Sequence, residues 1–183
     1  GTFRNGSGGG DFAFTPNLEY LETVRGMGVP VKGGDRHRSS VEENLLSFAL
    51  LDVSTAYIRS MQAAGYNEPL DQYVAMRIFR VTPDLVADYR ELGMTLSAED
   101  LVAGQIHGVS PAYVTEMREL ARHRVSFDDL VASRIHGATP EFLAEMRDLG
   151  YGGLDLDKYI AFRIHGVTRG FVEELAELGY RDV

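Results

Sequence analysis

The stretch "VSPAYVTEMRELA" at residues 109–121 decides the fold, because the chain repeats it. Related segments close at Gly65, Gly93, Ala121, Gly150 and Gly179, in steps of 28, 28, 29 and 29 residues. A fainter copy, "PNLEYLETVRGMG" (16–28), comes first, which makes six copies with a longer insert after the first. Periods of this size are typical of arrays in which neighbouring units bury one another's apolar faces.

Each copy has the pattern of a short helix. A hydroxyl residue stands at the N-cap position, where it can accept hydrogen bonds from unpaired backbone N–H groups; these residues are Ser54, Thr82, Ser110, Thr139 and Thr168. The closing glycine predicts a left-handed C-cap. Apolar residues at helical spacing predict a buried stripe, and it includes the equivalent aromatic residues Tyr57, Tyr113, Phe142 and Phe171.

A second helix is predicted between the copies. "SAEDLVAGQIHG" (97–108) and "SFDDLVASRIHG" (126–137) begin with a variant of the capping box, and "DLDKYIAFRIHG" (155–166) begins with Asp155. The expected final core residues of these helices are Ile106, Ile135 and Ile164. We therefore predict an all-α fold, a solenoid-like array of short helix–turn–helix repeats.

The domain organisation follows from the same pattern. Residues 1–13 are Gly-rich and predict a flexible N-terminal segment. Residues 14–183 predict a single α-helical repeat domain, with an irregular first copy and insert at 14–40 and a regular array at 41–183.

Three Ile-His-Gly triplets raise the question of a metal site. His107, His136 and His165 precede Gly108, Gly137 and Gly166, at the predicted end of the first helix of each unit. Packed helices lie about 8–10 Å apart, whereas zinc ligands must lie about 2.0–2.1 Å from one ion. We therefore predict structural helix ends and no metal or cofactor, with a pH-sensitive interface as the alternative.

Arginines recur at a second equivalent position. Arg77, Arg134 and Arg163 stand two residues before the histidine position, and Gln105 replaces arginine in one unit. A further row contains Arg90, Arg118 and Arg147. We predict that these arginines pair with acidic side chains of neighbouring units or line a surface for an acidic partner. The first row is the candidate binding surface.

Composition excludes several classes of function. The 183 residues carry a formal net charge of -9, which argues against nucleic-acid binding because that requires clustered basic residues. There is no cysteine, so disulfides and thiolate metal sites are excluded. The longest apolar run, at 45–51, is too short to cross a membrane. Motifs of the HExxH, GxSxG and phosphate-loop types are absent from the sequence.

The repeat resembles one from bacteria. A consensus of Arg-Ile-His-Gly-Val-Thr-Pro followed by Glu-Met-Arg-Glu-Leu-Gly-Tyr is matched approximately by residues 97–121, 126–150 and 155–180, and more weakly by 41–93. It is similar to a repeat in the C-terminal, extracytoplasmic part of some relatives of the beta-lactam-sensor type of membrane zinc metallopeptidase. The peptidase motif is absent here, so no catalytic residue carries over. The resemblance implies an accessory or sensory module, and it favours an extracytoplasmic location.

These observations predict a non-catalytic protein- or peptide-interaction module built from tandem helical repeats. Its partner is a protein or peptide rather than nucleic acid or a membrane, and the chain itself is expected to be a monomer or weak oligomer. The alternative is a structural or regulatory extracytoplasmic domain tethered to a membrane peptidase or signalling protein. A third hypothesis is an enzyme assembled from loops around His37 and His123, the two histidines outside the repeat register.

Overall fold

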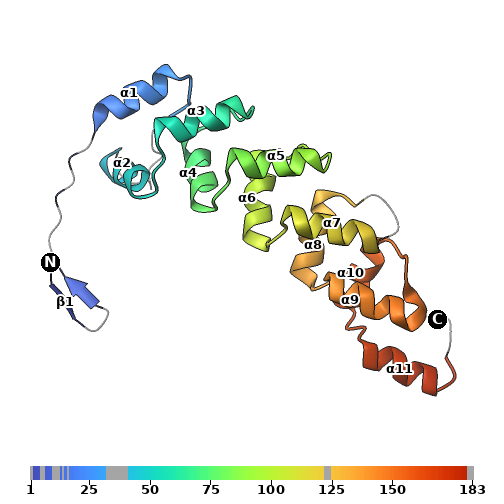
Figure 1. Ribbon diagram of the computed structural model, residues 1–183. Helices are drawn as coiled ribbons and strands as arrows, with labels where there is room; N and C mark the ends of the chain where they lie inside the picture. Colours follow the sequence, from blue (N-terminus) through green and yellow to red (C-terminus); the bar gives the residue numbers. More distant parts are fainter. Residues whose placement is uncertain are drawn as a thin grey trace. The chain divides into compact units, whose positions relative to one another are not determined.

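The computed structural model describes residues 2–4, 7–9, 13, 15, 17–31, 41–121 and 125–180. His37 and His123 lie outside these residues. The chain forms two compact units, Gly1–Ile78 and Phe79–Val183. Apart from one short hairpin, every regular element of the described part is a helix (Figure 1), so the predicted all-α class is confirmed.

In its described residues, the first unit contains the hairpin and four helices. Strand β1 (Thr2–Arg4) pairs with β2 (Ser7–Gly9) in antiparallel register, within the segment that the sequence predicts to be flexible. The helices are α1 (Leu18–Gly26), α2 (Val41–Leu50), α3 (Thr55–Ala63) and α4 (Leu70–Ile78). Helix α1 contacts α3, the equivalent helix of the next repeat.

The second unit continues the alternation of helices. These are α5 (Pro83–Glu91), α6 (Ala98–His107), α7 (Pro111–Leu120), α8 (Phe127–His136), α9 (Pro140–Met146), η1 (Arg147–Tyr151), α10 (Leu156–Ile164) and α11 (Arg169–Glu177). Equivalent helices contact one another: α5 contacts α7 and α7 contacts α9, while α6 contacts α8 and α8 contacts α10. The helices therefore form two rows, one for each half of the repeat.

The helix starts confirm the capping predictions. The hydroxyl of each predicted N-cap serine or threonine in α3, α5, α7, α9 and α11 accepts a hydrogen bond from the backbone N–H three residues later. Helices α6 and α8 have complete capping boxes, formed by Ser97 with Asp100 and by Ser126 with Asp129. Asp155 occupies the N-cap of α10, but its side chain makes no capping hydrogen bond there.

The helix ends differ according to whether glycine closes the repeat. Gly65, Gly93, Gly150 and Gly179 have positive φ angles, as predicted for left-handed caps. The equivalent Ala121 leaves its helix in an extended conformation, with φ -84° and ψ 148°. Its Cβ makes the left-handed conformation unfavourable, so an alanine cannot close the repeat as the glycines do.

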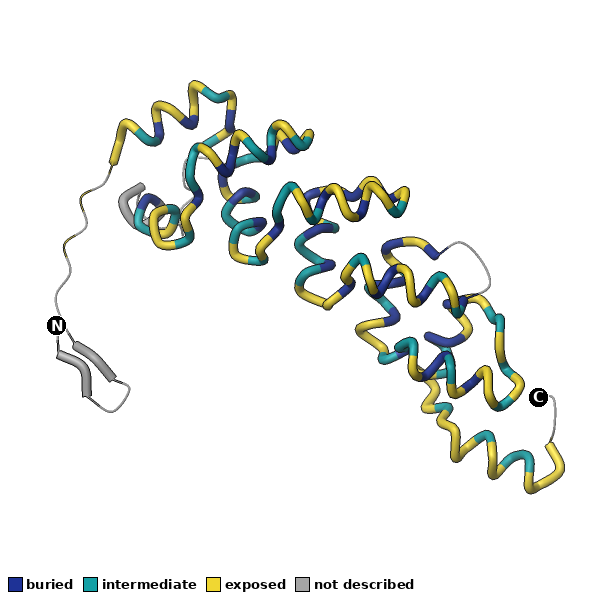
Figure 2. Tube along the Cα trace, in the orientation of Figure 1, coloured by how far each residue is buried: buried dark blue, intermediate teal, exposed yellow. Residues whose placement is uncertain are grey.

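The buried stripe of the repeat is confirmed in the middle of the second unit. In α9, Phe142, Leu143 and Met146 are buried. The prediction is wrong for the last copy, where Phe171 is 47% exposed and α11 buries no residue (Figure 2). Within the described residues no helix follows α11, so no later repeat covers its apolar face.

Candidate interaction surface

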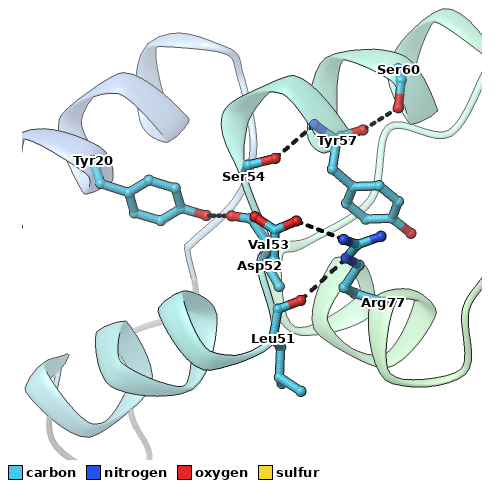
Figure 3. Close-up of polar contacts among 8 residues, drawn as sticks. All are labelled: Tyr20, Leu51, Asp52, Val53, Ser54, Tyr57, Ser60 and Arg77. Atoms are coloured by element: carbon cyan, nitrogen blue, oxygen red, sulfur yellow. Dashed lines mark hydrogen bonds and ion pairs between the residues drawn. The ribbon is translucent and has the colours of Figure 1, made fainter.

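Arg77 connects two repeats of the first unit. Its guanidinium carbon lies 5.1 Å from the centre of the Tyr57 ring. Its Nε donates a hydrogen bond of 3.2 Å to the carbonyl of Leu51 at the end of α2, and its terminal nitrogen lies 2.7 Å from Asp52 Oδ2 (Figure 3). The arginine therefore stacks on the second helix of a repeat and also binds the C-terminal end of the first helix, where carbonyl groups carry partial negative charge.

The other two arginines of the predicted row repeat this stacking. The guanidinium carbon of Arg134 lies 3.7 Å from the centre of the Tyr113 ring, and that of Arg163 lies 4.9 Å from the centre of the Phe142 ring. Both arginines remain exposed at the surface. The predicted pairing with an acidic side chain is present at Arg77, which contacts Asp52. The contact that all three arginines share is a cation over an aromatic face.

Gly137 lies close to Arg163. A Cβ atom built on Gly137 would lie 3.4 Å from a terminal nitrogen of Arg163. The glycine also has φ 76° as the left-handed cap of α8. Glycine at this position therefore closes α8 and leaves room for the arginine of the next repeat.

One pair of neighbouring repeats lacks both the arginine and the aromatic ring of this stacking contact. Gln105 replaces the arginine, and Leu85 replaces the aromatic residue beneath it. The residue equivalent to Gly137 is Arg80, which is exposed and has φ 56°. An arginine at position 105 would have no aromatic ring to stack on, and it would follow a helix end that already carries the positive charge of Arg80. The neutral glutamine avoids both problems.

The isoleucines of the Ile-His-Gly triplets are exposed, so the prediction that they complete the core is wrong. Ile106, Ile135 and Ile164 are 52%, 57% and 56% exposed. Each follows a buried core residue of its own helix by five positions, as Ile106 follows Leu101. Five residues rotate an α-helix by about 140° beyond a full turn, which carries the isoleucine away from the core face.

The three histidines lie beside these isoleucines and are also exposed. Gly108, Gly137 and Gly166 follow them with φ angles of 71°, 76° and 72°. Among the described residues, no group of three or more His, Cys, Asp or Glu side chains is placed to hold a metal ion. We call the six residues Ile106, His107, Ile135, His136, Ile164 and His165 the Ile-His row.

Buried tyrosines form a polar element that sequence reasoning missed. The Tyr113 hydroxyl lies 2.7 Å from Ser133 Oγ, which in turn donates a hydrogen bond to the carbonyl of Leu130. Ser133 is completely buried. Burial raises the pKa of Tyr20, Tyr57 and Tyr89 to about 12. The hydroxyl groups are neutral at physiological pH. Those of Tyr20 and Tyr89 donate hydrogen bonds to the carbonyls of Val53 and Val109, which begin the next copies of the repeat.

The second predicted arginine row also contributes to packing. Arg118 on α7 donates a hydrogen bond of 2.7 Å to the carbonyl of Leu92, which follows α5. Arg147 lies against Gly152, where a Cβ atom would lie 2.7 Å from its Cγ. At these places arginine stems and guanidinium groups support neighbouring turns.

Comparison of the chain with protein-family models, with curated proteins and with solved structures gives no match. In the described part of the chain, no helix is both long enough and apolar enough to cross a membrane.

Proposed function

We propose that this chain is a non-catalytic interaction module that binds a partner polypeptide along the Ile-His row. The observation that supports the proposal is the exposure of an isoleucine at the same position of three helices. Single exposed apolar residues are common on protein surfaces. Here the three isoleucines lie on α6, α8 and α10, and these helices contact each other in sequence. The apolar groups therefore recur along one direction.

The spacing of the helices specifies the form of the partner. Packed helices have axes about 8–10 Å apart. A polyproline II segment rises about 3.1 Å per residue and has three residues per turn, so every third side chain faces the same side and three residues span the step from one isoleucine to the next. A partner that contacts all three isoleucines would present an apolar side chain at about every third residue.

The groups around the isoleucines specify the charge of the partner. Arg134 and Arg163 stand directly before Ile135 and Ile164, and aromatic rings hold their guanidinium groups. A guanidinium has five N–H donors, and stacking on a ring leaves its edge free for a carboxylate. Groups that are already fixed lose little further conformational entropy on binding. The partner therefore carries acidic side chains among its apolar ones.

Peptide selection on the full chain tests the proposal. We would immobilise the chain and select from a display library of random peptides. We expect enrichment of sequences with apolar residues at every third position and Asp or Glu between them. Burial of an isoleucine contributes about 1.5–3 kcal/mol, so Ile135→Ser should weaken the selected peptides about tenfold or more.

The matched control is Leu178→Ser, which replaces an exposed leucine outside the row. This variant should bind the selected peptides as well as the parent chain does. Peptides that lack the three-residue spacing and bind Ile135→Ser without loss would contradict the proposal. Selection of no peptide would favour the alternative of a tethered structural or regulatory domain.

A further inference from the structure

A cleft of about 220 Å3 lies between α1 and α2 in the first unit. Its walls come from both helices and from the turn that follows α2; the lining residues are Asn17, Tyr20, Leu45, Phe48, Ala49, Asp52, Val53 and Ser54. Most of the lining is apolar, and Ala49 is exposed at the cleft. The cleft lies within one unit and is separate from the Ile-His row.

The repeat alignment explains the cleft. Ala49 on α2 occupies the position that arginine holds in other repeats. It stands two residues before Leu51, and the arginines stand two residues before the equivalent positions; these are Arg77 before Phe79, Arg134 before His136 and Arg163 before His165. Tyr20 occupies the position of the aromatic residues on which those arginines stack. The first repeat therefore has the ring but lacks the arginine. We propose that this cleft binds the guanidinium group of an arginine on a partner polypeptide.

The Tyr20 ring is already held in a fixed position. Its hydroxyl donates a hydrogen bond of 2.6 Å to the carbonyl of Val53 (Figure 3). The Phe48 ring packs beside it at a centroid separation of 6.1 Å. A ring fixed at its hydroxyl and at its side offers a preorganised face to a cation. The same arrangement keeps the phenol neutral, because burial raises the pKa of Tyr20 to about 12.

The charge at the cleft suits a cation. Asp52 lines it with a carboxylate that is 71% exposed and lies 2.7 Å from the Arg77 guanidinium. A carboxylate has two oxygens and can accept hydrogen bonds from more than one donor. An incoming guanidinium would therefore meet an aromatic face and a carboxylate, the two kinds of group that Arg77 contacts in the next repeat.

Arginine fits this cleft better than lysine does. A guanidinium is planar, stacks on aromatic faces and is more weakly hydrated than an ammonium group. The chain itself uses arginine at all three of the ring-stacked positions and lysine at none of them. The side chain that the fold accepts at this position is therefore an arginine.

Small probes on the isotope-labelled full chain test the proposal by NMR. The probes are N-acetyl-arginine amide and N-acetyl-citrulline amide, which have similar shapes but differ in charge. We expect arginine to shift the Tyr20 ring resonances saturably in the millimolar range, with citrulline at least about fivefold weaker. Equal shifts from the two probes would overturn the proposal, and so would the absence of a saturable shift with arginine.

Two variants at position 49 separate binding from changes in folding. Ala49→Arg should place the chain's own guanidinium on Tyr20 and remove the response to the arginine probe. Ala49→Ser leaves the cleft open and should keep that response. An Ala49→Arg variant that is folded and still binds the probe at the Tyr20 ring would show that the cleft is not the site. These results are independent of peptide binding to the Ile-His row, because the variants change only the first unit.

Discussion

Helices α9 and α11 carry nearly the same repeat, yet their side chains lie in different surroundings. In α9, Phe142 is 5% exposed and lies beneath Arg163 of α10. In α11, the equivalent Phe171 is 47% exposed, and within the described residues no helix follows to cover it. The comparison teaches that a repeat helix does not bury its own stripe. The next repeat buries it, so stability in the array depends on neighbours.

The largest expected effect comes from the matched change of these two phenylalanines. Phe142→Ala should lower the free energy of unfolding by about 3–5 kcal/mol, because it removes a buried ring from a packed site. Phe171→Ala removes a ring that is already half in water and should cost about 1–2 kcal/mol. Urea unfolding followed by circular dichroism measures both. Equal losses would mean that α11 is covered in solution.

The second comparison is between the buried stripe and the exposed helix end. Leu143→Ala should cost about 2–5 kcal/mol, because Leu143 is 1% exposed and its removal leaves a cavity. His136→Ala should cost less than about 1 kcal/mol, because the exposed histidine supports only the end of α8. Thermal unfolding of the two variants measures both losses of stability. A larger loss for the histidine variant would assign it a role that packing does not explain.

The third prediction compares two left-handed glycines. Gly137→Ala and Gly166→Ala should each cost about 1–2 kcal/mol, because both positions have φ above 70° and alanine is strained there. Gly137→Ala should cost slightly more, since its Cβ would meet Arg163, whereas position 166 faces open space. Chemical denaturation under identical conditions measures the difference. A greater loss of stability for Gly166→Ala would contradict the effect expected from Arg163.

The smallest expected effect is the coupling of Arg163 to Phe142. A double-mutant cycle with Arg163→Met and Phe142→Leu should give a coupling energy of about 0.5–1 kcal/mol, as expected for an exposed cation on a ring. A control cycle with Arg163→Met and Tyr57→Leu should be additive, because the Tyr57 ring contacts Arg77 instead. A coupling energy near zero in the first cycle would mean that the stacking does not contribute to stability.

Local signals in the sequence predicted the helices and their ends. A serine or threonine N-cap, a capping box and a closing glycine each act within a few residues, so they can be read without knowledge of the fold. The structure confirms these at Ser126 with Asp129 and at Gly150. Ala121, which has a Cβ where the other copies have glycine, leaves its helix in an extended conformation.

Contacts between repeats were harder to predict. The exposure of Ile106 could have been deduced, since its five-residue distance from Leu101 turns it off the core face. The exposure of Phe171 depends on packing between helices, because within the described residues no later helix lies against α11. The stacking of arginines on rings also joins residues about 20 positions apart. The sequence did contain one signal for this stacking. The repeats with Tyr57, Tyr113 and Phe142 are each followed by an arginine, whereas the repeat with Leu85 is followed by Gln105.

The repeats that carry Leu85 and Gln105 show that neighbouring repeats in such an array differ in how well they fit each other. A repeat that brings an arginine packs best after a repeat that offers a ring and a helix end free of positive charge, and each such ring contact contributes about 0.5–1 kcal/mol. The copy with Arg80 and Leu85 offers neither. Repeats are therefore not freely interchangeable, although they share length and outline. Recombination that duplicates, deletes or shuffles whole repeats loses this stabilisation wherever it separates matching partners, so the pairs across these boundaries favour the present order of the repeats.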